Sequence, residues 1–228
     1  MKPTDLTRKT LLAIFDRLLQ HFGPRYWWPA ETPFEVIVGA ILTQQVAWRN
    51  TATAIAHLKR EGRLSPQGIL ALPDPALWEL IRPTRFYRQK ADRLRAFCRV
   101  LQEDFGGELD RLFALDIKTL RRLLLALPGI GEETADSIIL YAAGMPIFVI
   151  DAYTQRVFTR LGLIDRPMSY GSLQSRLMAR LPRDTALYNE YHALLDGLGH
   201  HLCLRQSPRC QACPLDDLCG HHTEKAPS

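Results

Sequence analysis

The chain has 228 residues, of which 46% are hydrophobic and 23% charged, and it can bury one large core or two smaller ones. No apolar run approaches the ~20 residues that span a membrane, and the N-terminus has no apolar signal core. These features exclude an integral membrane protein and predict a cytoplasmic protein, of a bacterial or archaeal nucleoid. The formal net charge of +5, dominated by arginine, suits phosphate contacts or simply a basic, soluble surface.

Apolar residues at helical spacing recur along the chain, and Pro or Gly stands at nearly every boundary. The patterns predict helical segments in five stretches: 6–23, 33–62 (two helices), 73–83, 88–107 and 117–129. The only β-leaning run is short, Met145–Asp151. We therefore expect an all-α protein.

Four of the five cysteines are grouped near the end of the chain with the spacing C-x6-C-x2-C-x5-C: Cys203, Cys210, Cys213 and Cys219. Thiols stay reduced in the cytosol, so a disulfide pair is the weakest interpretation. Zinc and an iron–sulfur cluster are both bound by four thiolates. The spacing thus predicts a metal centre.

A second motif is LPGIG, in which Gly129 and Gly131 flank Ile130 between two helical stretches. The glycines allow positive φ and close backbone approach. Ile130 is expected to enter the core, and the N–H groups of the following helix point out of the turn. Such an element binds a DNA backbone without reading sequence; an ordinary tight turn is the simpler alternative.

The helix after LPGIG places Glu133, Asp136, Ser137 and Tyr141 on one polar face, predicted to be solvated or to line a cleft. Eighteen residues after Glu133, Asp151 follows an apolar run and precedes a helical pattern, which predicts an N-cap. The carboxylate of Asp151 could serve as a cap alone or also stabilise positive charge on a sugar.

Taken together, LTQQ, LPGIG, VIDAYTQRV and the cysteine string, in that order, make the chain resemble the helix–hairpin–helix DNA glycosylases, the superfamily of endonuclease III. The likeness runs from about Leu11 to Cys219. It implies two all-helical domains with a cleft between them: a six-helix domain with the hairpin over residues 26–145, and a second domain of residues 1–25 plus 146–228. The cysteine spacing is similar to the [4Fe–4S] loop of endonuclease III, so the resemblance favours that cluster over zinc.

The resemblance also implies roles for individual residues. Asp151 stands at the catalytic aspartate of the superfamily, and Gln45 stands near the side chain that fills the gap left by a flipped base. Endonuclease III has a lysine in its hairpin motif, LPGVGRKTA, and Glu133 occupies that position here. A carboxylate cannot form a Schiff base, so we expect a monofunctional glycosylase with weak or absent AP lyase activity. Glu133 could contact the base, position the water or shape the pocket.

The chain is most similar to the 3-methyladenine glycosylase branch, through WWP, IRPTRFYRQKADRL and GIGEETADSIILY. Trp27, Trp28 and Trp48 stand where that branch lines its base pocket, although tryptophans can also simply close a core seam. The branch's best-known members lack the iron–sulfur cluster. Arg205 and Arg209, in the cysteine loop, could reach phosphates or only aid solubility.

The sequence therefore predicts a monomeric enzyme that binds double-stranded DNA with a damaged base and excises alkylated purines such as 3-methyladenine. Aromatic faces stack on such a cationic base. The alternatives are a glycosylase for uracil, hypoxanthine or an oxidised pyrimidine, and a non-catalytic protein that binds DNA structures.

Overall fold

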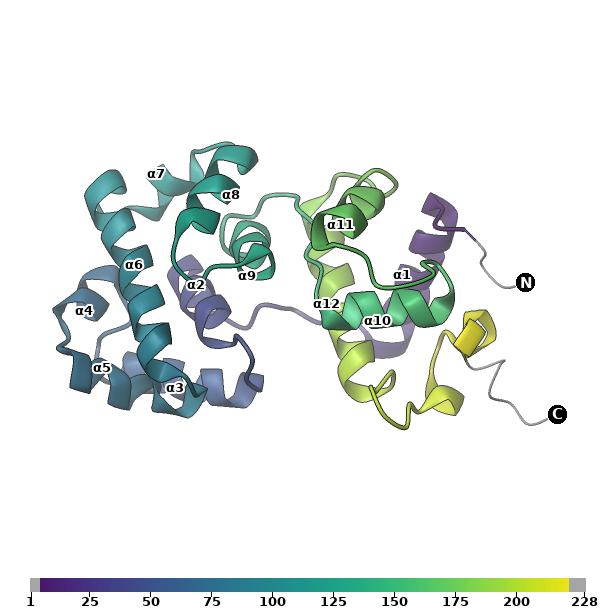
Figure 1. Ribbon diagram of the computed structural model, residues 1–228, viewed down its shortest axis with the longest axis horizontal. Coiled ribbons are helices and arrows are strands. Elements are labelled where there is room, and N and C mark those ends of the chain that lie inside the picture. Colours follow the sequence, from purple (N-terminus) through teal and green to yellow (C-terminus); the bar gives the residue numbers. More distant parts are fainter. Residues whose placement is uncertain (1–4, 222–228) are drawn as a thin grey trace. The chain divides into compact units, whose positions relative to one another are not determined.

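A computed structural model describes residues 5–221 of the chain, and every regular element in that span is helical (Figure 1). The helices predicted from the apolar spacing are confirmed; for example, the first ends at Phe22, with Gly23 as its C-cap. None of the helices within the described span has the length and apolar character needed to cross a membrane.

The chain divides into two compact units. Residues 28–145 form the hairpin unit, and residues 1–27 together with 146–228 form the cysteine unit. The hairpin unit contains α2 (Pro33–Leu42), α3 (Trp48–Arg60), α4 (Pro66–Ala71), α5 (Asp74–Ile81), η1 (Arg82–Thr84), α6 (Tyr87–Phe105), α7 (Leu109–Phe113), α8 (Ile117–Ala126), α9 (Glu132–Ser137) and the π-helical turn η2 (Ile138–Ala142). The cysteine unit contains α1 (Arg8–Phe22), α10 (Ala152–Leu161), α11 (Tyr170–Met178), α12 (Thr185–His201), η3 (Cys210–Ala212) and η4 (Asp216–Leu218).

Helix α2 forms the centre of the hairpin unit. Thr32 caps it by accepting a hydrogen bond from the N–H of Glu35, and Pro33 occupies the first turn, where no N–H is needed. Every residue from Phe34 to Leu42 is buried. The unit has eight α-helices instead of the predicted six, because Gly and Pro residues isolate the short helices α4 and α7.

The polar face predicted for the helix after LPGIG is not a solvated face. Asp136 is fully buried, and both of its oxygens accept hydrogen bonds from Arg121 on α8, at 2.7 and 3.2 Å. The two charge-assisted hydrogen bonds from Arg121 offset the desolvation cost of burying a carboxylate. Arg121 stands 15 residues away in the sequence. This ion pair joins α8 to α9 on either side of the hairpin turn.

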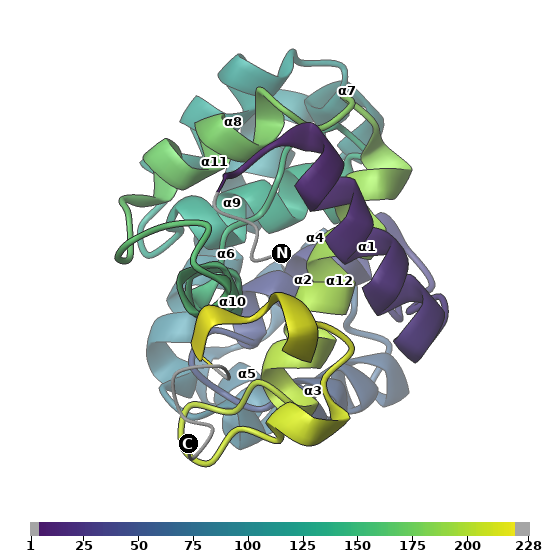
Figure 2. The same cartoon turned by 90° about the vertical axis from the view of Figure 1, so that its right-hand side faces the viewer.

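In the cysteine unit, α1 packs against α12 (Figure 2). The Tyr191 hydroxyl donates to the carbonyl of Leu11 at 2.8 Å, and the Tyr191 ring meets Phe15 edge-on at 5.4 Å. Arg17 on α1 also pairs with Asp217 in the cysteine segment. Helix α1 is thus fixed both to α12 and to the segment that follows α12 and carries the cysteines.

The β-leaning run before Asp151 forms no strand. Residues Ile147–Ile150 are buried. Two of their backbone groups bind side chains: Gln174 donates to the carbonyl of Phe148 at 2.7 Å, and the Ile150 N–H donates to the Tyr170 hydroxyl at 3.3 Å. Side chains of α11 thus anchor this run.

Candidate active site and cysteine centre

Asp151 is the N-cap of α10, as its position in the sequence predicts. Its Oδ1 atom accepts hydrogen bonds from the N–H of Thr154 at 2.6 Å and from the Thr154 hydroxyl at 2.7 Å. The side chain is only 9% exposed. Both bonds use one oxygen, and the positive end of the helix favours a negative charge there. Asp151 is therefore a well-oriented carboxylate with its second oxygen outside the cap.

The second oxygen, Oδ2, lies 3.7 Å from Nε2 of His192 on α12. One turn further along α12 stands Asp196, and its burial, followed by the charge of Asp151, raises the pKa of its carboxyl group. Burial also raises the pKa of Tyr153, the second residue of α10. The start of α10 thus lies in a group of titratable side chains.

Two of the three predicted pocket tryptophans meet within the hairpin unit. The Trp28 ring packs edge-on against Trp48 and against Tyr141 of η2, with centroid distances of 5.4 Å in both pairs. The Trp28 indole also lies so close to Gly39 that a Cβ there would stand 2.9 Å from its Nε1 atom. Trp27 belongs to the cysteine unit.

Trp28 thus closes a core seam over α2, as the simpler interpretation has it, and all three rings remain partly exposed. The sequence places Tyr141 on a polar face, but in the structure its ring packs against Trp28. The structure brings it to Trp28 through the π-helical turn, which re-aims side chains relative to a regular helix.

The LTQQ loop is fastened to the hairpin through Gln44. Its side-chain amide donates to the carbonyl of Gly129 at 3.1 Å and to the Thr134 hydroxyl at 2.8 Å, and its Oε1 accepts from Arg93. Gln45 is exposed instead, with a left-handed backbone at φ +58°. The two neighbouring glutamines therefore have different surroundings: Gln44 binds the hairpin, and Gln45 faces solvent. The sequence alone does not distinguish them.

The hairpin turn itself matches the prediction in part. Ile130 is buried, and Gly129 adopts φ +75° with its Cα against the Arg93 side chain, so that a Cβ would overlap the guanidinium. Gly131 has φ −90° and is the N-cap of α9. Only Gly129 needs glycine for its conformation. Glu133 lies exposed in the first turn of α9.

A buried lysine holds two loops of the hairpin unit together. Lys90 on α6 is 1% exposed, and its ammonium group donates to the carbonyls of Leu42 at 2.8 Å and Thr84 at 2.6 Å. Burial lowers the pKa of Lys90 to about 8. Leu42 ends α2 and is the first residue of LTQQ, and Thr84 ends η1.

The turn after η1 carries an exposed aromatic side chain. Arg85 and Phe86 both have left-handed backbones, at φ 53° and 45°, and Phe86 is 55% exposed. This conformation is strained for a non-glycine residue, and such strain is concentrated at functional sites. Neither the exposure of Phe86 nor the strain is predictable from local sequence.

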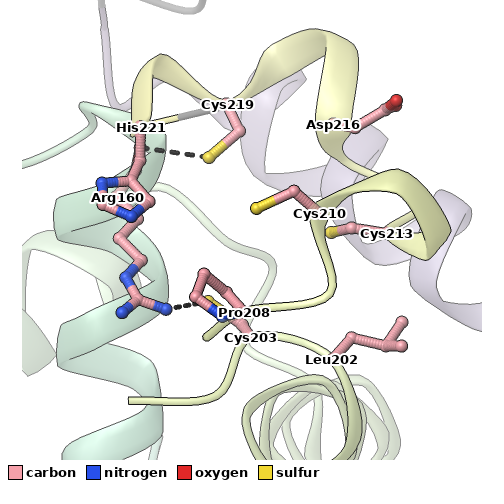
Figure 3. A pocket seen from close by; sticks show the side chains of 9 residues that line it. All are labelled: Arg160, Leu202, Cys203, Pro208, Cys210, Cys213, Asp216, Cys219 and His221. Atoms are coloured by element: carbon pink, nitrogen blue, oxygen red, sulfur yellow. Dashed lines mark hydrogen bonds between the residues drawn. The ribbon is translucent and has the colours of Figure 1, made fainter. Parts of the chain in front are cut away.

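The four clustered cysteines surround one cavity of the cysteine unit (Figure 3). The cavity is lined by Cys203, Cys210, Cys213 and Cys219 together with Arg160, Leu202, Pro208, Asp216 and His221. Within residues 5–221, no three or more His, Cys, Asp or Glu side chains are arranged so that they could hold a metal ion, so the predicted metal centre stays a prediction. Burial raises the pKa of Cys213 to about 11, so metal binding at this thiol would release a proton.

Arg160 on α10 stabilises the cysteine segment from one side. Its guanidinium donates to Sγ of Cys203 at 3.2 Å, to the carbonyl of Leu204 at 2.7 Å and to the carbonyl of Arg205 at 3.0 Å. A cation next to a sulfur ligand suits a thiolate acceptor. The side chains of Arg205 and Arg209 are exposed. The fifth cysteine, Cys98, is a buried core residue as predicted.

An all-helical chain in which a glycine hairpin is followed in sequence by a capping aspartate and then by four cysteines has the features of a DNA-repair glycosylase. The chain belongs to the HhH-GPD superfamily of base excision DNA repair proteins, whose pattern matches residues 38–183. The resemblance to the endonuclease III superfamily is thereby confirmed.

Relatives and solved structures agree with this assignment. A Methanocaldococcus jannaschii protein provisionally named a DNA repair glycosylase is 42% identical over 208 residues, covering 90% of this chain and 94% of that protein. A non-covalent endonuclease III–DNA complex superposes with a TM-score of 0.82 at 26% identity, covering 96% and 98% of the two chains. A Helicobacter pylori 3-methyladenine DNA glycosylase bound to 1,N6-ethenoadenine gives a TM-score of 0.72 at 25% identity, covering 84% and 95%.

Proposed function

We propose that this DNA glycosylase is monofunctional and excises alkylated purines from double-stranded DNA, leaving an abasic site and acting as a monomer. The proposal rests on which residues stand at two positions of the motifs. Glu133 occupies the hairpin position of the endonuclease III lysine, while Asp151 is retained as an oriented, nearly buried carboxylate.

The base would be held by aromatic rings. Alkylation at N3 or N7 makes a purine cationic, and aromatic faces favour a cation, at about 1–3 kcal/mol per stacked base. Trp28, Trp48 and Tyr141 already form one aromatic group. Because they are partly exposed, they offer ring surface to an extruded base. Trp27 is proposed as a further base-contacting residue from its place in the sequence.

The sugar would be stabilised by Asp151. A cationic base leaves as a neutral molecule, so little general acid is needed, and the main demand is stabilisation of the oxocarbenium-like sugar. Oδ1 of Asp151 is fixed by Thr154, which leaves Oδ2 to interact with the positive charge or the attacking water. Two roles fit Glu133: contact with the base and positioning of that water.

Strand cleavage would be weak or absent, since it requires an amine that attacks C1′. Glu133 supplies none. Lys90 has a lowered pKa, as reactive lysines do, but its ammonium group is buried and donates to two carbonyls of the protein. We therefore expect no efficient Schiff base at either position.

The DNA contacts would come from the hairpin and the two loops near it. The backbone around Gly129, Ile130 and Gly131 would bind phosphate without sequence preference. Gln45 would enter the gap left by the flipped base. Phe86, exposed in its strained turn, has the character of an apolar wedge between base steps.

The four cysteines are proposed to bind a [4Fe–4S] cluster. Four thiols around one cavity, with a guanidinium donating to one sulfur, fit a group that is held by four thiolates. When bound, the cluster would stabilise the loop that follows α12. Arg205 and Arg209, exposed on that loop, are candidates for phosphate contact.

The substrate proposal is tested by base release from a panel of duplexes. One arm uses DNA methylated to contain 3-methyladenine and 7-methylguanine, and the other arms carry uracil, hypoxanthine or an oxidised pyrimidine. Release of methylated purines without strand breaks is the expected result. Release of another base alone would replace the substrate class, and tight duplex binding with no release at all would favour a DNA-structure-binding protein.

The lyase proposal is tested by borohydride reduction during turnover, which traps a Schiff base as a protein–DNA adduct. We expect no adduct from the wild-type protein. The Glu133→Lys variant, which restores the endonuclease III residue, is the matched positive control. A high yield of adduct with the wild-type protein would contradict the proposal.

The cluster proposal is tested on anaerobically purified protein by measuring iron, acid-labile sulfide and zinc. Iron and sulfide in equal amounts, with little zinc, are expected. Cys210→Ser should lower both, whereas Cys98→Ser, at the buried core cysteine, should leave them unchanged. Stoichiometric zinc without sulfide would contradict the proposal.

A further inference from the structure

The start of α10 is held on α12 in a fixed register. Tyr153 lies directly over Gly199, where a Cβ would overlap the tyrosine ring. The Arg156 guanidinium donates to the carbonyls of Gly199 and Cys203, both at 2.8 Å, and stacks on the Tyr153 ring at 4.9 Å. Because these contacts fix one helix against the other, they also fix which residues of α12 lie next to Asp151.

The residue of α12 next to Asp151 is His192. Nε2 of the imidazole and Oδ2 of the carboxylate are 3.7 Å apart, and the two side chains are only 11% and 9% exposed. With so little water around the two side chains, an imidazolium at this position would interact strongly with the carboxylate. Since Thr154 occupies Oδ1, His192 lies at the oxygen that remains for the substrate.

Asp196 stands four residues after His192, on the same face of α12. The charges of Asp151, His192, His200 and Arg25 act on its carboxyl group. Burial is the main cause that raises its pKa, and the charge of Asp151 is the next. The charges of both aspartates also raise the pKa of Tyr153 on α10, after burial. Two carboxylates, one imidazole and their cationic neighbours thus form one electrostatic group.

We propose that His192 is a positioning residue that orients the Asp151 carboxylate, and that Asp196 sets the charge that His192 carries. This inference rests on the proposed catalytic role of Asp151. A neutral imidazole leaves the negative charge of Asp151 available to the sugar. An imidazolium competes with the sugar for that charge, so base release should fall as the pH drops and His192 takes up a proton.

The predicted effects differ between variants. His192→Gln should lower the maximal rate of base release about 10- to 100-fold, because the carboxylate loses its orientation, with little change in duplex affinity. It should also remove the acid limb that His192 creates in the pH profile. Asp196→Asn removes a negative charge that favours the imidazolium, and should move that limb to lower pH.

The experiment measures single-turnover release of 7-methylguanine from a methylated duplex between mildly acidic and mildly basic pH, alongside duplex binding. His201→Gln is the matched control, since His201 is exposed at the end of the same helix and should leave the rate and the profile unchanged. A wild-type rate and pH profile for a folded His192→Gln protein would overturn the inference, even with the proposed function intact.

A second measurement does not depend on activity. The ring of His192 is titrated by NMR in the wild-type protein and in Asp151→Asn, which retains a capping side chain. Loss of the neighbouring negative charge should shift the His192 titration to lower pH, while that of His201 should not move. Identical His192 curves would overturn the inference, whereas full base release by Asp151→Asn would instead overturn the proposed role of Asp151.

Discussion

An aspartate of the hairpin unit, Asp136, and one of the cysteine unit, Asp151, are both largely buried but have different partners. In the hairpin unit, Asp136 is fully buried, with both oxygens bonded to Arg121. In the cysteine unit, Asp151 is 9% exposed, with one oxygen bonded to Thr154 and the other 3.7 Å from the His192 imidazole.

The difference between these partners shows how one fold can give two carboxylates different electrostatic surroundings. Arg121 is permanently charged and bidentate, and the pairing raises its already high pKa. The partner of Asp136 therefore keeps its own positive charge at every accessible pH. An imidazole is a weaker and titratable partner, and we propose that the Asp151 carboxylate acts on the substrate.

The largest expected effect comes from Asp151→Asn. The change keeps a helix-capping side chain but removes the charge, so base release should fall on the order of 10²- to 10³-fold, while the free energy of unfolding falls by less than about 1 kcal/mol. Single-turnover release and urea denaturation measure the two quantities. An unchanged release rate would place the catalytic charge elsewhere.

The opposite pattern is expected for Asp136→Asn. The variant leaves the Arg121 guanidinium without its main counter-charge, so the free energy of unfolding should fall by about 3 kcal/mol. Base release per folded molecule should remain close to that of the wild type. The double variant Asp136→Asn, Arg121→Met should recover part of the lost stability, and loss of release in a fully folded Asp136→Asn protein would contradict the structural assignment.

A smaller effect is expected at the hairpin turn, where the chain offers a matched pair of glycines. Gly129→Ala places a side chain in a left-handed backbone against Arg93, so stability should fall by about 1–2 kcal/mol and duplex binding should weaken. Gly131→Ala, at φ −90° with no atom near its Cβ position, should change stability by less than about 1 kcal/mol. Equal losses in the two variants would contradict the assigned geometry.

The smallest expected effect is the pH dependence caused by Lys90, a buried cation that donates to two carbonyls. Its pKa is lowered from 10.5 to about 8 in the folded protein. Between these two pH values the unfolded chain binds more protons, so stability gained through Lys90 should rise with pH in that window. Denaturation curves should show this rise in the wild-type protein and a smaller one in Lys90→Met; identical slopes would contradict the buried state of the amine.

The sequence by itself determined the helical class, the hairpin turn with its buried Ile130, and Asp151 as the cap of α10. It also singled out four cysteines, which line one cavity of the cysteine unit. These features depend on helical periodicity, on turn chemistry and on side chains a few residues from the groups that they bind, as Thr154 is from Asp151.

Only the tertiary structure decided which polar residues are buried and which aromatic rings meet. Gln44 binds Thr134, 90 positions further along the chain. Arg121 forms an ion pair with Asp136, which is buried although it lies on a face predicted to be polar. Tyr141 reaches Trp28, and His192 reaches Asp151, only because helices distant in sequence pack together. Burial and pairing over such separations depend on the summed packing of whole helices, which no local pattern encodes.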